Sequence, residues 1–115
     1  MSLLALLFAG LAAHPQSAPP PERPSMECEV GPLHRTFGGS RWILYSCVDG
    51  ETLVMAADEG NPASPFYFIL YPRDGGYHLY GEGAGSREAS AAAMEELRAL
   101  TPEGIRALIR QTQAR

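Results

Sequence analysis

Two β-rich segments that flank Asp49-Gly50 constrain the fold more than any other feature of this sequence. They read RWILYSCV, residues 41–48, and ETLVMAAD, residues 51–58. An Asp-Gly dipeptide suits the two positive-φ positions of a type I′ turn, so the pattern predicts a β-hairpin with a two-residue loop. A loop of that length pairs Tyr45 with Val54 and sets the register along both strands.

Alternation along this hairpin gives it two apolar faces. One face carries Trp42, Leu44, Leu53 and Met55, and the other carries Ile43, Tyr45, Cys47, Val54 and Ala56. An apolar sheet face is stable only when other elements of the chain or a partner cover it. The main question about the fold is therefore what covers each face.

A second hairpin follows the connection EGNPASP, residues 59–65, whose prolines interrupt strand pairing. It consists of FYFILY, residues 66–71, a turn PRDGG, and YHLYGEG, residues 77–83. Phe66 and Phe68 share one face of this hairpin, and Tyr67 and Tyr71 lie on the other. We expect the phenylalanine face to lie in the core and the tyrosine face to keep its hydroxyl groups within reach of water or a partner.

The hydrophobic period then changes to that of helices. Ser86 is an N-cap residue before REASAAAMEELRAL, residues 87–100, and Thr101 caps a second amphipathic helix that begins at Pro102. The predicted fold class is α+β, a four-stranded antiparallel meander of two hairpins followed by two C-terminal helices packed on one face. The opposite face would be covered by loops, by the segment around Cys28, or by a partner.

The amino-terminal part of the chain predicts export. The apolar run SLLALLFAGLAA within residues 1–13 is shorter than the roughly 20 residues that cross a bilayer, and it ends in small residues, as cleavable signal peptides do. Residues 14–27 have the composition of a proline-rich disordered linker. Residues 28–115 then form one small domain. We expect a periplasmic or secreted bacterial protein with no stable membrane span after cleavage.

The chain has two cysteines, Cys28 and Cys47. Cysteines of an exported protein pair in its oxidising compartment, so we predict a disulfide that stabilises the domain by about 3 kcal/mol. A catalytic thiol with a histidine partner is the alternative. No metal site is predicted, because the cysteine spacing matches no ligand pattern and the three histidines stand alone.

The charge pattern narrows the classes of partner. The formal net charge is −4 and the arginines are scattered, whereas nucleic-acid binding needs clustered positive charge. We therefore expect no nucleic-acid partner. The glycines of YGEGAGS, residues 80–86, lack the spacing of dinucleotide and phosphate-binding loops. We expect a flexible strand-to-helix connection there, and no cofactor.

Two further segments are expected to be loops. GPLHRTFGGSR, residues 31–41, contains His34 and reads as a glycine-rich loop. Asp58, Glu59 and Asn61 form an acidic cluster that offers too few alternating oxygen ligands for calcium. A solvated loop is the expected structure there.

Candidate binding residues lie on the tyrosine faces of the two hairpins. They are Tyr45, Tyr67, Tyr71, His78 and Tyr80. Aromatic side chains on a sheet face away from the covering helices are typical of a binding patch. A histidine is also the usual acid or base of a hydrolase, so a small hydrolase around His78 is an alternative, although no serine here has a G-x-S-x-G context.

Residues 45–55, YSCVDGETLVM, resemble the periplasmic C-type lysozyme inhibitors. In those small exported β-proteins a strand carrying Tyr-x-Cys runs into an Asp-Gly turn and an alternating second strand. The family resembles a β-barrel whose inhibitory loop and second cysteine lie toward the carboxyl end, whereas this chain ends in predicted helices and has its other cysteine upstream. The segment EGAGS also lacks the family's Ser-Gly-x-x-Tyr pattern. No functional residue is assigned from this resemblance.

Together these features predict a small exported binding or accessory domain. It would contact a protein or a cell-envelope component through its aromatic sheet face and the loop of residues 59–65. Inhibition of a lysozyme is one alternative, implied by the resemblance, and a hydrolase around His78 is another. No catalytic constellation is evident in the sequence, so we do not expect an enzyme.

Overall fold

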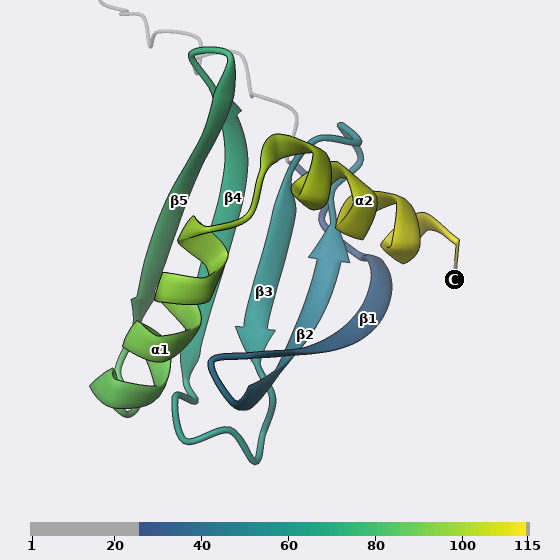
Figure 1. The fold of residues 1–115 in the computed structure, drawn as a ribbon. Coiled ribbons are helices and arrows are strands. Elements are labelled where there is room, and N and C mark those ends of the chain that lie inside the picture. The colour runs from purple at the N-terminus through teal and green to yellow at the C-terminus, as the bar shows by residue number, and fades with distance from the viewer. Residues whose placement is uncertain (1–25, 115) are drawn as a thin grey trace, which may run out of the picture.

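The computed structural model describes residues 26–114 and confirms the α+β fold class (Figure 1). The elements are β1 Val30–Phe37, β2 Ser40–Ser46, β3 Leu53–Ala57, β4 Phe66–Arg73, β5 Gly76–Gly83, α1 Arg87–Arg98 and α2 Pro102–Gln113. The strands form one antiparallel sheet in the order β1-β2-β3-β4-β5. The predicted signal peptide, residues 1–13, and the predicted linker as far as residue 25 lie outside the described residues.

The sheet has five strands, and the prediction of four was wrong because β1 was taken for a glycine-rich loop. Gly31 and Pro32 open this strand, and its register with β2 shifts between Val30 and Leu33. Proline and such an irregularity are tolerated because β1 is an edge strand. Both features obscure the alternation from which a strand is recognised in sequence, and His34 consequently lies on a strand.

The register predicted for the first hairpin is confirmed, but its turn differs from the prediction. Tyr45 pairs with Val54, and the Cys47 amide donates to the Thr52 carbonyl at 3.0 Å. Asp49 does not have the positive φ that a type I′ turn requires, and Gly50 does, at 70°. The loop therefore spans residues 48–51. A two-residue turn with positive φ at both positions occurs instead between β4 and β5, at Asp74 and Gly75.

The Asp49 carboxylate closes the first hairpin. It accepts hydrogen bonds from the Glu51 amide at 2.9 Å, the Thr52 amide at 3.0 Å and the Thr52 hydroxyl at 2.6 Å. Desolvation raises the pKa of Asp49, but the hydrogen bonds from Thr52 and Glu51 outweigh it and hold this pKa below its ordinary value of 3.8. The charged form of Asp49 therefore stabilises the folded state.

We expect Asp49→Ala to lower the free energy of unfolding by about 1 kcal/mol at pH 7, because three donors lose their acceptor at a largely exposed site.

The contribution of the Asp49 charge to stability should depend on pH. Since the folded-state pKa of Asp49 lies below the unfolded one, this contribution is present above pH 3.8 and is lost as pH falls through the folded-state pKa. Urea unfolding of wild type and Asp49→Asn at pH 7 and pH 2.5 measures this. A difference that grows on acidification would contradict the assignment.

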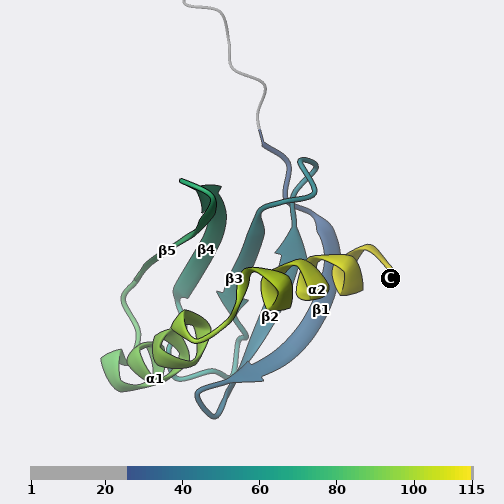
Figure 2. The ribbon, with the colours of Figure 1, turned by 45° about the horizontal axis from the view of Figure 1, so that its top comes forward.

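Both helices cover one face of the sheet and leave the other without a helix (Figure 2). The predicted phenylalanine face is the core: Phe68 is fully buried and Leu70 nearly so. The Trp42 ring is also fully buried and packs against Phe66 and Phe68 at centroid distances of 6.4 and 5.1 Å. The core residues come from this face, from the helices and, in the case of Ala63, from the connection between β3 and β4. They are Leu33, Phe37, Trp42, Leu44, Leu53, Met55, Ala63, Phe68, Leu70, Ala93, Leu97, Ile105 and Ile109.

The predicted helix starts are confirmed. The Ser86 hydroxyl accepts from the Ala89 amide at 3.2 Å, and the Thr101 hydroxyl accepts from the Gly104 amide at 3.0 Å. These contacts satisfy backbone donors that a helix leaves unpaired at its first turn. α1 ends at Arg98, two residues before the predicted end.

One buried polar contact joins α2 to the sheet. The hydroxyls of Ser46 and Thr112 lie 2.7 Å apart, both buried, and Thr112 also donates to the Ile109 carbonyl. Thr112 therefore accepts the Ser46 proton. Every buried side-chain polar atom in the described part of the chain has a partner, and removing Thr112 would leave the buried Ser46 hydroxyl without its acceptor.

We expect Thr112→Val to lower the free energy of unfolding by about 1 to 2 kcal/mol, because the Ser46 hydroxyl then lacks an acceptor. Ser46→Ala should cost less, since Thr112 keeps its bond to the Ile109 carbonyl. The double variant should cost less than the two single changes added together. A urea-unfolding double-mutant cycle measures the coupling, and strictly additive effects would exclude the hydrogen bond.

The connection from β5 to α1 was predicted to be flexible, and the structure shows close packing there instead. A Cβ atom at Gly85 would lie 2.0 Å from the Ala63 carbonyl oxygen. The Ala84 amide donates to the Pro65 carbonyl at 2.8 Å, and the Ser86 amide donates to the Pro62 carbonyl at 2.9 Å. Position 85 requires a glycine because the backbone there touches the backbone at Ala63. This contact fixes residues 62–65 beside the end of the sheet.

Candidate functional site

Cys28 and Cys47 form the predicted disulfide. It ties the incoming chain to the end of β2, and the Val48 amide extends this attachment by donating to the Glu27 carbonyl at 2.8 Å. Both cysteines of the chain are consumed by the bond, so the alternative of a catalytic thiol is wrong for this oxidised form. A disulfide is compatible with an oxidising, extracytoplasmic location. Among residues 26–114, no helix is long and apolar enough to cross a membrane.

The sheet face opposite α1 and α2, here called the open face, is organised in rows of cross-strand neighbours. The first row is His34, Ile43, Ala56, Tyr67 and Glu82; the second is Tyr45, Val54, Ile69 and Tyr80; the third contains Tyr71 and His78. All five predicted binding residues thus lie on the open face. Alternation along paired strands in the correct register is what brings them together.

The aromatic side chains of the open face remain accessible. Tyr67 is 37% and Tyr80 42% exposed, while Tyr45 and Tyr71 are half-buried among their neighbours. The Tyr71 and His78 rings pack against each other with centroids 5.1 Å apart. Within residues 26–114 no helix or strand covers this face. It is an aliphatic and aromatic surface bordered by polar and charged groups, including His34, Arg41 and Glu82.

A carboxylate lies between two tyrosines on the edge strand β5 of the open face. The Tyr80 and Tyr67 hydroxyls both donate to Oε1 of Glu82, the latter at 3.5 Å, and the two rings have centroids 6.3 Å apart. The hydrogen bond to Glu82, with desolvation and the charge of Glu82, raises the pKa of Tyr80 to about 12. Tyr80 therefore remains a hydrogen-bond donor throughout the physiological pH range.

Sequence reasoning missed Glu82. A signal was present, because Glu82 follows Tyr80 by two residues and so shares its face on a strand. Its contact with Tyr67 depends on the register between β4 and β5, in which these two residues are partners.

A hollow of about 640 Å³ adjoins Glu82 at the end of the sheet. Ala56, Tyr67 and Glu82 line it from the open face, and Ser64 and Pro65 line it from the connection between β3 and β4. Its other lining residues are Ala57, Phe66, Gly83 and Ala84. The hollow forms because several of its lining residues, such as Ala56 and Gly83, have small side chains or none.

The connection of residues 58–65 is more ordered than the predicted solvated loop. Asn61 is buried, donates to the Arg41 carbonyl at 2.6 Å and accepts from the Ala63 amide at 2.8 Å. Asp58 forms an ion pair with Arg41 at 3.7 Å. These contacts hold Ser64 and Pro65 in place as one wall of the hollow.

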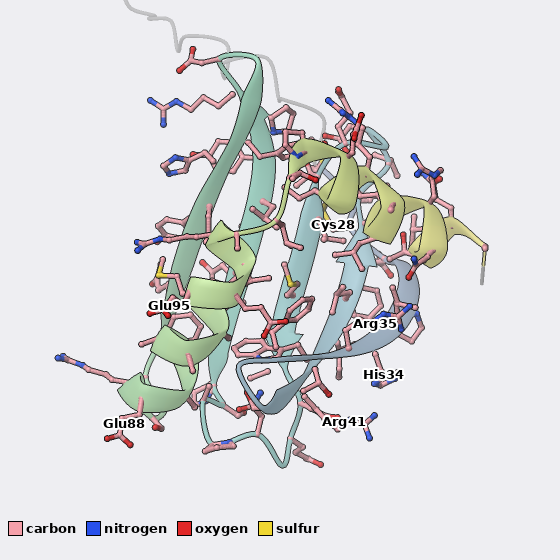
Figure 3. All side chains as sticks on the ribbon, viewed as in Figure 1. Cys28, His34, Arg35, Arg41, Glu88 and Glu95 are labelled. Carbon is pink, nitrogen blue, oxygen red and sulfur yellow. A yellow bond between two sulfur atoms is a disulfide. The ribbon has the colours of Figure 1, made fainter. Side chains whose placement is uncertain are left out.

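The two histidines of residues 26–114, His34 and His78, do not form a recognisable catalytic arrangement. Arg41 Nη2 lies 3.4 Å from Nδ1 of His34, and both side chains project from the strands near the β1 edge of the sheet (Figure 3). His78 contacts Tyr71, and in residues 26–114 no hydrogen bond joins its imidazole to a serine or a carboxylate. A second hollow, of about 520 Å³, opens on the helix side of the sheet and is lined by His78 and Arg98 together with apolar residues that include Leu79 and Leu100.

The comparisons with known proteins leave the family open. No protein-family model, no curated protein and no solved structure matches this chain. In the described part of the chain, no group of three or more His, Cys, Asp or Glu side chains could hold a metal ion.

Proposed function

We propose that this chain is an exported, disulfide-linked binding or accessory domain that contacts a protein or a cell-envelope component through its open face. The observation that carries the proposal is the aromatic character of a sheet face without a covering helix. Tyrosines are favoured at binding surfaces because each offers a large, rigid apolar area together with a hydroxyl group. Tyr67 and Tyr80 are the most exposed of them.

The open face supports the proposal better than the other surfaces do. Aliphatic residues in the middle of it, Ile43, Val54 and Ile69, are only partly buried. A contiguous apolar surface of this kind, bordered by polar groups, is typical of an interaction site. The helix surfaces, in contrast, carry scattered charges such as Glu88, Glu95 and Arg106.

Export is supported by the signal-like residues 1–13 together with the Cys28–Cys47 bond. The intact mass of protein recovered from an exporting bacterial host should lack about 12 to 18 amino-terminal residues. Its cysteines should resist alkylation until a reductant is added. A full-length protein with two free thiols would contradict export.

The binding role is tested by capture of envelope components on immobilised protein. The double variant Tyr45→Ser/Tyr71→Ser removes two rings from the middle and one end of the open face while leaving the buried core unchanged. We expect it to lose the captured component. Glu95→Gln on the exposed surface of α1 is the matched control and should retain it. Equal capture by both variants, with folding verified by circular dichroism, would refute the proposal.

Two alternatives are separable by direct assay. Inhibition of a lysozyme is suggested by the resemblance at residues 45–55, which include the end of β2, the turn and the start of β3. A lytic assay with purified protein tests it, and undiminished lysis would remove it. For a hydrolase around His78, any activity found should disappear in His78→Gln. Retention of that activity would exclude His78 as its base.

A further inference from the structure

We infer that the Glu82 hollow receives a cationic side chain, an arginine or lysine, of a partner polypeptide. The inference rests on the proposed function, because it names the chemistry that one end of the open face recognises. It is carried by three features found together: a carboxylate with an unused oxygen, two flanking aromatic rings, and an adjoining apolar hollow.

The carboxylate has capacity for a further donor. Both tyrosine hydroxyls bond to Oε1 of Glu82, and no bond to Oε2 is found within residues 26–114. A carboxylate accepts about four hydrogen bonds. Oε2 is therefore the atom at which a guanidinium or ammonium group would donate.

The negative charge of the Glu82 carboxylate has no ion-pair partner within residues 26–114. The two ion pairs in that part of the chain join Arg41 to Asp58 and Arg73 to Asp74. Arg41 lies on β2, separated from Glu82 on β5 by two intervening strands. The whole chain also carries a net charge of −4. A positively charged ligand group is favoured both locally and over long range.

The surroundings suit a cation on an apolar stem. The Tyr67 and Tyr80 rings flank the carboxylate, and a cation over a tyrosine face gains a further attraction. The hollow beside them is bounded by Ala56, Pro65 and the Tyr67 ring. Arginine and lysine place three or four methylene groups next to their charge, and those groups would occupy the hollow while the charge reaches Glu82.

The test uses a short acetylated peptide amide in which one arginine is flanked by leucines, and a second peptide in which citrulline replaces the arginine. Citrulline has nearly the same shape but no charge. Titration into isotopically labelled protein, followed by NMR, should shift the amides of Tyr67, Glu82 and Ala84 saturably. We expect the citrulline peptide to bind about fivefold more weakly, as an exposed ion pair and cation–π contact imply.

Variants connect this preference to the carboxylate. Glu82→Gln should abolish the difference between the peptides, and Glu95→Gln on α1 should preserve it. Equal binding of both peptides to wild-type protein, or an unchanged preference in Glu82→Gln, would overturn the inference. The peptide titration uses purified protein, so its result is independent of the capture experiment. If the Tyr45→Ser/Tyr71→Ser variant loses the captured component but the wild-type protein binds both peptides equally, the inference is refuted and the proposed function stands. If the wild-type protein prefers the arginine peptide but captures no envelope component, only the proposed function is refuted.

Discussion

Gly38→Ala should lower the free energy of unfolding by about 3 kcal/mol or more. Gly38 has φ +61°, which costs a residue with a side chain about 1 kcal/mol. A Cβ atom there would also lie 2.4 Å from the backbone of Ala92 and Ala93 in α1. That backbone cannot rotate away as a side chain can, so α1 must move or the turn must open, at a cost of about 1 to 3 kcal/mol. The Gly38 amide would lose its bond to Glu96 Oε1, now 2.7 Å.

Gly39→Ala is the matched control. Gly39 follows Gly38 in the same turn and has φ +83°, but nothing lies within 4 Å of its added Cβ. It should cost only the conformational penalty, about 1 kcal/mol. The difference between the two variants in chemical denaturation isolates the contact between the β1–β2 turn and α1, which lie side by side in Figures 1 and 2. Equal effects would show that this contact does not exist in solution.

Loss of the Cys28–Cys47 bond should have the second large effect, a decrease of about 3 kcal/mol in the free energy of unfolding. The bond closes a loop that contains both β1 and β2. Without it, the incoming chain at β1 is held by the Val30–Ser46 pairing and the Glu27–Val48 hydrogen bond. The unfolded chain also gains freedom, which favours unfolding.

Urea unfolding with and without a reductant measures this effect in one chain. The double variant Cys28→Ala/Cys47→Ala controls for the reductant itself and should unfold at the same urea concentration in both conditions. An unchanged midpoint for the wild-type protein on complete reduction would contradict a stabilising role for the bond.

Local sequence patterns were sufficient to predict much of this fold. The β2–β3 register follows from alternation around Asp49-Gly50, and Ser86 and Thr101 mark helix starts through bonds to their own first turns. Such features depend on neighbours in sequence. The turn type at residues 48–51 was wrong because the Asp49 side chain stabilises a different loop with the same ends.

Features that depend on distant contacts were not predictable in this way. β1 was missed because its opening Gly31-Pro32 resembles a loop, although Leu33 and Phe37 alternate into the core. The five aromatic residues of the open face were found, since alternation together with the short hairpin turns groups them. The Glu82 hollow was missed because it requires the β4–β5 register and the packing of residues 62–65 against the strand-to-helix connection.

Site-specific photo-crosslinking tests the central claim, that the open face binds a partner, most directly. A photoreactive phenylalanine analogue would replace Tyr71 or Tyr80 on the open face in cells of the source organism, with Arg106 of α2 as the exposed control position. We expect a discrete crosslinked species from positions 71 and 80 and none from position 106. No adduct at the open-face positions of a folded, disulfide-bonded protein, or the same adducts at all three, would contradict the claim.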